Sequence, residues 1–151
     1  MDVEKIVREN IDKTIHMSLA TSADNKPWVC ELHFAYDGEL NLYWRSKKSR
    51  RHSQEIEQNP NVAGNIVQQL GIKDSVVGIY FEGIAEELID VDSNHPAFLT
   101  LNSRLGLDES AIDEAEEDDG HKVYKVSVQN WYAFGRFGAD HGQKLKLEWK
   151  V

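Results

Sequence analysis

The chain opens with the hydrophobic spacing of a helix and then changes to that of a strand. In the first dozen residues the apolar side chains recur every three or four positions, at Val3, Ile6, Val7 and Ile11. This spacing places them on one face, so we predict an amphipathic helix over residues 2–13. From Thr14 onward, apolar residues at 15, 17 and 19 alternate with polar or small ones, and this alternation predicts a half-buried strand.

Two further alternating runs follow, each preceded by a turn. Residues 22–27 have the composition of a turn, and residues 28–36 then alternate with the even-numbered side chains on the apolar face. Residues 40–45 alternate in the same way. Between these two runs, Asp37-Gly38 predicts a two-residue hairpin turn of type I′, in which both residues have positive φ.

The rest of the chain predicts more strands, interrupted by short helices. The predicted elements are a helix at 50–58 with Ser49 as its N-cap, a strand at 62–68, a β-rich run at 76–91 with Gly78 and Gly83 as bulges or close approaches, helices at 96–105 and 108–118, and strands at 121–134 and 144–150 separated by a glycine-rich bend at 134–138. We therefore predict a mainly β protein with six or seven mostly antiparallel strands, a small β-barrel with flanking helices. We expect residues 1–151 to form one domain. The missing strand–helix–strand alternation argues against a Rossmann domain.

Composition and charge narrow the classes of partner. The formal net charge is −9 at pH 7, so the protein as a whole repels nucleic acid and anionic membranes. No apolar run approaches the ~18 residues that cross a bilayer, and the charged N-terminus is not followed by a signal-peptide core. We therefore expect a cytoplasmic protein with no nucleic-acid or membrane partner. The single cysteine, Cys30, excludes an internal disulfide and a cysteine-based zinc site.

One segment departs from this acidic background. From Arg45 to Arg51 the chain has five basic residues and two serines in seven positions, where a predicted strand runs into the helix that ends at Asn59-Pro60. A helix N-terminus presents unpaired amides and partial positive charge, so cations and hydroxyls placed there predict a bound phosphate. The predicted clamp consists of Arg45, Ser46, Lys48, Ser49, Arg50 and Arg51. The alternative is a solvated basic helix start without a ligand.

The remaining candidates give weaker signals. The six histidines are scattered without ligand spacing, so no metal site is predicted. Cys30 lies on the apolar side of its strand and is predicted to be a core residue, as are the tryptophans Trp28, Trp44 and Trp149. Trp131 is close to a glycine-rich bend and is the better candidate for stacking on a planar ring. The residues alone therefore predict a barrel that binds a phosphorylated, aromatic ligand.

Short motifs spread over nearly the whole chain resemble a known family. They are Leu-Ala-Thr at 19–21, Lys-Pro-Trp-Val at 26–29, Glu-Leu-Asn-Leu-Tyr-Trp at 39–44, Ser-Arg-Arg-His at 49–52, Asn-Pro-Asn-Val-Ala-Gly at 59–64 and Phe-Glu-Gly at 81–83. In this order they are similar to the split-barrel flavoproteins of the pyridoxamine 5′-phosphate oxidase-like superfamily. The resemblance is closest to a small subfamily rather than to the true oxidase.

The resemblance implies a six-stranded antiparallel split barrel of the FMN-binding type, which forms a homodimer with two FMN sites at the subunit interface. It implies that the FMN phosphate is held at the strand-to-helix junction, by Arg45, Ser46, Lys48, Ser49, Arg50 and Arg51. The flavin ring is expected along the second strand, where the backbone can hydrogen-bond the ring edge, at Val29, Cys30, Glu31 and Leu32. Aromatic residues of the partner chain close the ring site in such proteins, and Trp131 is the candidate here.

One departure from the family bears on the activity. The true oxidase has an Arg-Leu-His-Asp-Arg type motif near its C-terminus for the substrate phosphate, whereas this chain ends in Lys-Leu-Lys-Leu-Glu-Trp-Lys-Val. The expected function is therefore an FMN-binding flavoprotein, an oxidoreductase without an assigned substrate. The alternatives are a deazaflavin-dependent relative and a non-catalytic module that binds flavin or haem or serves in a stress response.

Overall fold

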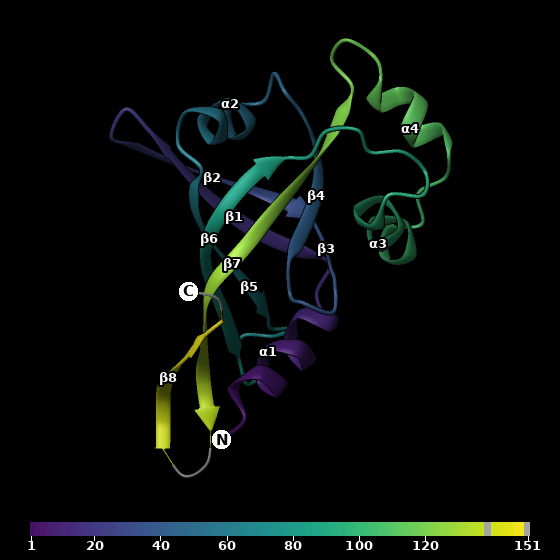
Figure 1. The fold of residues 1–151 in the computed structure, drawn as a ribbon. Helices are drawn as coiled ribbons and strands as arrows, with labels where there is room; N and C mark the ends of the chain where they lie inside the picture. Colours follow the sequence, from purple (N-terminus) through teal and green to yellow (C-terminus); the bar gives the residue numbers. More distant parts are fainter. Residues whose placement is uncertain (138–139, 150–151) are drawn as a thin grey trace.

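The structure is a computed structural model that describes residues 1–137 and 140–149 (Figure 1). In chain order its elements are α1 Val3–Asp12, β1 His16–Ala23, β2 Lys26–His33, β3 Ala35–Tyr36, β4 Leu42–Lys47, α2 Arg51–Gln58, β5 Asn61–Gln68, β6 Val77–Glu87, α3 Pro96–Leu105, α4 Ser110–Ala115, β7 His121–Phe137 and β8 Asp140–Glu148. Within these residues no helix has the length and apolar composition that a membrane crossing requires.

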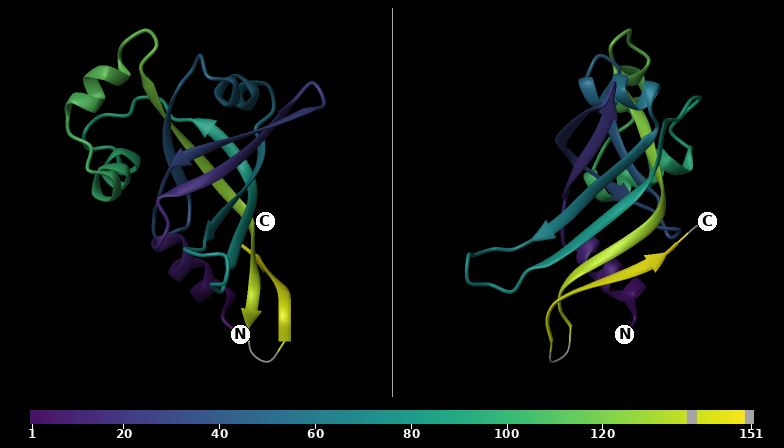
Figure 2. Two further views of the ribbon diagram at one scale, coloured as in Figure 1. Left: turned by 180° about the vertical axis from the view of Figure 1, so that it is seen from behind. Right: turned by 90° about the vertical axis from the view of Figure 1, so that its left-hand side faces the viewer.

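The strands form one curled antiparallel sheet with helices on its outside. Its order is β2-β1-β5-β6-β7-β4-β3, and β8 pairs with β7 beside this path. This confirms the predicted class, a mainly β, split-barrel-like fold with flanking helices. The described part has eight strands rather than six or seven, because the predicted strand at 28–36 is divided into β2 and the two-residue β3. The β1–β2 hairpin extends past the barrel beside α2 (Figure 2).

Two separate cores hold the helices to the sheet. The main core fills the barrel and includes the fully buried Trp44, Trp131 and Phe81. A smaller apolar cluster lies between α3 and the outer side of β3, β4 and β7, and its buried members are Ala35, Tyr43, Ala97, Leu101 and Val123. The outer side of β4 is therefore covered by helices, whereas β2 is an edge strand of the sheet.

A glycine permits the bend in the central strand pair, β6 and β7. The β6–β7 register shifts between Glu82, which is opposite Asn130, and Gly83, which is opposite Val128. The extra residue of the bulge is therefore Gln129 on β7, across from the predicted position at Gly83, whereas the register passes Gly78 without a shift. A Cβ atom on Gly83 would lie 2.3 Å from the carbonyl oxygen of Ser127, a separation that no side chain tolerates. The long strands can curve at this point because the two backbones approach so closely.

The turns differ from the predicted ones. Asp37 and Gly38 do not have positive φ, so the predicted type I′ turn is wrong; the positive φ lies at Leu40 instead, at 58°. The longer loop forms because the Asp37 carboxylate accepts bonds from the amides of Glu39 and Asn41, at 2.9 Å each. The two-residue turn with positive φ joins β1 to β2, at Asp24 and Asn25.

Several predicted boundaries are also corrected. Arg50, not Ser49, is the N-cap of α2, because the Ser49 hydroxyl donates to Asp119 instead. The last acidic helix is shorter than predicted and covers Ser110–Ala115. The predicted bend at 134–138 is strand as far as Phe137, and its Gly138 lies outside the described residues.

Candidate functional site

The start of α2 has the properties of an anion site. Its N-cap Arg50 makes no side-chain capping bond, and its first turn has no acidic residue. The first amide of the helix with a carbonyl partner is that of Gln54, which donates to Arg50 at 3.1 Å. Within the described residues the amides of Arg51, His52 and Ser53 have no acceptor. These amides can therefore donate hydrogen bonds to a bound anion.

Half of the predicted clamp faces away from this point. Arg45 donates to Glu114 of α4 at 2.7 Å and has 17% of its side chain exposed. Lys48 forms an ion pair with Glu87 at 3.5 Å, and Ser49 bonds Asp119. The structure thus brings Lys48 to the C-terminal end of β6, and Arg45 and Ser49 to α4 and the segment after it. Each of the three already has an acidic partner there.

Arg50 and Arg51 lie on the other side. Arg50 is exposed and has no ion-pair partner in the part of the chain that the structure describes. The guanidinium of Arg51 lies 4.2 Å from the ring centroid of Trp28 on β2, within the range of a cation–π contact. The same side chain donates to Glu55 at 2.7 Å. Arg51 therefore connects the start of α2 with the edge strand β2.

Beneath the helix start, Ser46 and His52 form a buried pair. The hydroxyl of Ser46 lies 2.8 Å from Nε2 of His52, and both residues are buried. Burial lowers the pKa of His52, and the neighbouring Arg50 lowers it further. Ser46 therefore holds a neutral imidazole under the helix start rather than pointing its hydroxyl outward.

The outer edge of β2 is open along the residues predicted to face a ring. Backbone hydrogen bonds alternate along an antiparallel pair. The Phe34 amide, just after β2, donates to the carbonyl of Ile15, just before β1. The alternation therefore directs the N–H and C=O groups of Val29 and Glu31 away from β1. Cys30 and Leu32 direct theirs toward β1. Two of the four predicted residues can thus offer backbone groups to a ligand.

The tryptophans are distributed differently from the prediction. Trp131 is fully buried and packs against Phe81, with ring centroids 5.7 Å apart, so the prediction that it closes a partner's ring site is wrong. Trp28, predicted to be in the core, is 42% exposed. Trp44 is in the core as predicted, and Trp149 packs against its border. Since Trp28 is the exposed one among these tryptophans, the available aromatic surface lies on β2, next to the exposed Val29.

Two further features of β1 and β2 were not found from the sequence. His16 and His33 are opposite each other in the hairpin, and their ring centroids lie 4.3 Å apart. The described residues contain no group of three metal-ligating side chains. Cys30 is half-buried and packs against the border of the main core. Burial, with Glu31 beside it, raises the pKa of its thiol to about 11. Cys30 therefore stays protonated at neutral pH.

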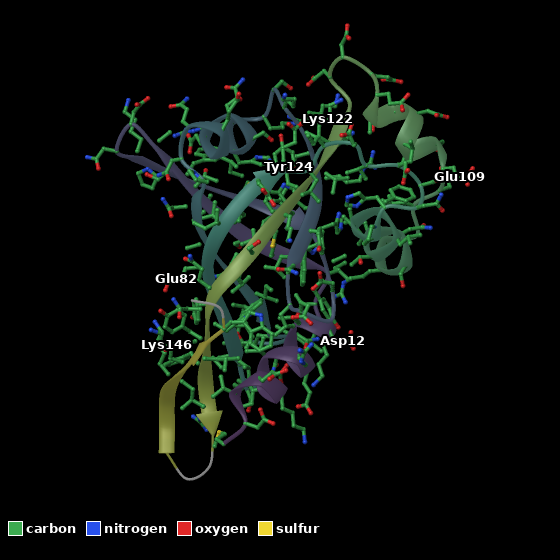
Figure 3. The ribbon with its side chains drawn as sticks, viewed as in Figure 1. Asp12, Glu82, Glu109, Lys122, Tyr124 and Lys146 are labelled. Atoms are coloured by element: carbon green, nitrogen blue, oxygen red, sulfur yellow. The ribbon has the colours of Figure 1, made fainter. Side chains whose placement is uncertain are left out.

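A large cavity lies on the opposite side of β4. It has a volume of about 620 Å³ and is bounded by α4, the β6–α3 connection and the start of β7. Its cations are engaged. Glu114 pairs with Arg45, Glu87 pairs with Lys48, and Lys122, at the start of β7 (Figure 3), donates to the backbone carbonyls of Ala115 and Glu117. A cavity whose cations already have hydrogen-bonding partners is a poorer phosphate site than the open start of α2.

Comparison with known proteins establishes the fold. No family profile matches the chain, and no curated protein matches its sequence. Among solved structures, a heme binding protein from Mycobacterium smegmatis superposes with a TM-score of 0.78 at 16% identity, over 98% of this chain and 58% of that one. The chain thus spans 58% of the length of that protein.

Two other solved structures match over most of both chains. The General Stress Protein 26 from Bacillus anthracis has a TM-score of 0.65 at 21% identity, covering 97% of this chain and 100% of that one. A FAD-binding protein from Mesorhizobium loti has a TM-score of 0.66 at 16% identity, over 88% and 92%. The chain therefore shares the fold of these proteins, which is the split-barrel-like fold that the resemblance in the sequence implied.

Proposed function

We propose that this protein binds FMN where the start of α2 meets the edge of β2. The observation that carries the proposal is the uncapped helix start, whose free amides lie beside Arg50 and Arg51. A phosphate monoester carries about two negative charges at neutral pH and suits such a site. The contact of Arg51 with Trp28 supports a single ligand that extends from the helix start to β2.

The edge of β2 suits the ring of the same ligand. Val29 and Glu31 direct backbone donors and acceptors outward, and the polar edge of a flavin ring needs both kinds of partner. The side chains of Trp28 and Val29 are 42% and 58% exposed, so apolar surface lies next to these polar groups. In this proposal, residues 51–53 and Arg50 hold the phosphate, and residues 29–31 orient the ring.

A second copy of the chain completes the site. An edge strand with free backbone groups and exposed apolar side chains is a surface that proteins cover. A homodimer would cover β2 and exclude water from one side of the ring. We propose this arrangement in place of the one in which Trp131 closes the ring site.

The proposed activity is that of an oxidoreductase. Bound FMN would supply the electron transfer, while the protein holds it and controls access to it. The cations at α2 fix the position of the phosphate and do not act as acids or bases. Cys30 does not serve as a nucleophile at neutral pH, since the pKa of its thiol is about 11.

Haem is the second candidate ligand. The observation that favours it is the pair His16 and His33 on the exposed hairpin, since imidazole nitrogens are common iron ligands. The likeness in fold to the heme binding protein from Mycobacterium smegmatis supports the same candidate.

The absorption spectrum separates the two ligands. We expect purified protein mixed with FMN and passed through a desalting column to keep the flavin bands, and the variant Arg50→Glu to lose them, because the new carboxylate repels the phosphate. Protein mixed with haem is the parallel sample. A Soret band that His33→Ala abolishes, with no retained flavin, would replace the FMN proposal with the haem one.

A further inference from the structure

A closed circuit of contacts joins α2 to the β1–β2 hairpin. Thr21 and Trp28 are directly opposite each other in the hairpin, so their side chains share a face. The Thr21 hydroxyl donates to Glu55 Oε1 at 2.9 Å. The other oxygen of Glu55 accepts Nε of Arg51 at 2.7 Å, and the Arg51 guanidinium lies over the ring of Trp28. The four side chains thus connect the helix with both strands of the hairpin.

This circuit leaves one edge of Arg51 free. Glu55 occupies the Nε–H group, and Trp28 covers one face of the guanidinium. The two Nη groups have no acceptor within residues 1–137 and 140–149. Because a guanidinium binds oxyanions through a planar fork, the free Nη edge is the part of Arg51 that can contact a phosphate.

We propose that Glu55 is a positioning residue, which together with Thr21 fixes the Arg51 fork for a phosphate monoester at the start of α2. Trp28 extends the same ordering to the edge of β2. The proposal rests on the proposed function, since the phosphate monoester is that of FMN.

An ordinary ion pair on a helix surface does not account for Glu55. Its exposure is 7%, and both of its oxygens are used, one by Thr21 and one by Arg51. Burying a carboxylate is unfavourable unless it is fully hydrogen-bonded, so the arrangement is built rather than incidental. Glu57 on the same helix is exposed and has no ion pair in the described part, which makes it a matched control.

The two possible roles of Glu55, as a nearby charge and as a positioning residue, predict opposite changes in phosphate affinity when its charge is removed. As a nearby negative charge, Glu55 repels a phosphate, so Glu55→Gln should tighten binding, as should Glu57→Gln. As a positioning residue, Glu55 aims the fork, so Glu55→Gln should weaken binding because a neutral amide holds Arg51 less firmly. The sign of the change therefore separates the two roles.

The experiment compares FMN, riboflavin and inorganic phosphate as probes of the wild type and the two variants. We expect Glu55→Gln to weaken FMN binding about tenfold, the effect of loosening one charge-assisted contact, and to change riboflavin binding by less than about twofold. Glu57→Gln should stay within about twofold of the wild type for both flavins. A merely structural role would lower the melting temperature without separating FMN from riboflavin.

Each outcome bears on one proposal or the other. Unchanged or tighter FMN binding by Glu55→Gln overturns the positioning role and leaves the proposed function in place. If the wild type binds inorganic phosphate but not FMN, the proposed function fails, and weaker phosphate binding by Glu55→Gln still supports the positioning role. Binding of neither overturns both. If Glu55→Gln does not fold, Arg51→Lys is the substitute, since it keeps the charge and removes the fork; unchanged FMN affinity in that variant also overturns the proposal.

Discussion

The two ends of the basic segment have different surroundings. Arg45 and Lys48 lie toward α4 and β6, where Glu114 and Glu87 neutralise them. Arg50 lies at an uncapped helix start without an acidic partner in the described residues. The comparison shows that the number of cations in a segment does not locate an anion site. An anion site is located by the cations that have no acidic partner after folding.

The largest effect that this comparison predicts is on ligand affinity. Arg50→Gln and Lys48→Gln remove the same charge two positions apart. We expect Arg50→Gln to weaken FMN binding about thirtyfold, because it removes a charge-assisted contact. Lys48→Gln should change it by less than about threefold, since Glu87 already neutralises Lys48. Equal losses in fluorescence titrations of the two variants would erase the distinction between the two ends.

The neutralised end should matter for stability instead. Glu114 accepts bonds from Arg45 and from the ring and amide of His121, so Glu114→Gln removes a charged partner from three donors. We expect the free energy of unfolding in urea to fall by about 1–2 kcal/mol, because hydrogen bonds to charged groups contribute about 1.5–3 kcal/mol and the partial exposure of Glu114 reduces this. FMN affinity should not change. A loss of affinity with unchanged stability would place the ligand near α4.

The smallest predicted effect is a pH dependence beneath the open end. Burial lowers the pKa of His52, so the unfolded chain binds a proton at a higher pH than the folded protein does. Stability is therefore full above the ordinary histidine pKa and declines as pH falls through it toward the folded value. His52→Gln should flatten this part of the profile in urea titrations between pH 8 and 5. A wild-type profile that is already flat would exclude a buried neutral imidazole.

Much of the fold could be predicted because alternation and helical spacing are local signals. The strands, the helix at the N-terminus and the close approach at Gly83 all follow from neighbouring residues. Alternation shows which side chains share a face but not whether anything covers that face. For this reason the predicted burial of Trp28 and the predicted exposure of Trp131 are both wrong: Trp28 is on an edge strand, and Trp131 is on a central one.

The site could be predicted only in part, for a similar reason. The junction between β4 and α2 was found from its charge, but the partners of its cations come from distant segments. Arg45 pairs with a carboxylate 69 residues further along the chain, and Ser49 with one 70 residues further. Only the folded sheet brings these residues together. The pairing of His16 with His33 depends in the same way on the hairpin register.

The most direct test of the central claim is to locate the ligand by backbone amide NMR during an FMN titration. We expect the amides of Arg51, His52 and Ser53 and those of Val29 and Glu31 to shift together, saturating at one FMN per chain. The amides of Ser110–Ala115 in α4 should not move. Shifts confined to α4 and the start of β7, with the α2 amides unchanged, would contradict the claim and place the ligand in the large cavity beside Arg45.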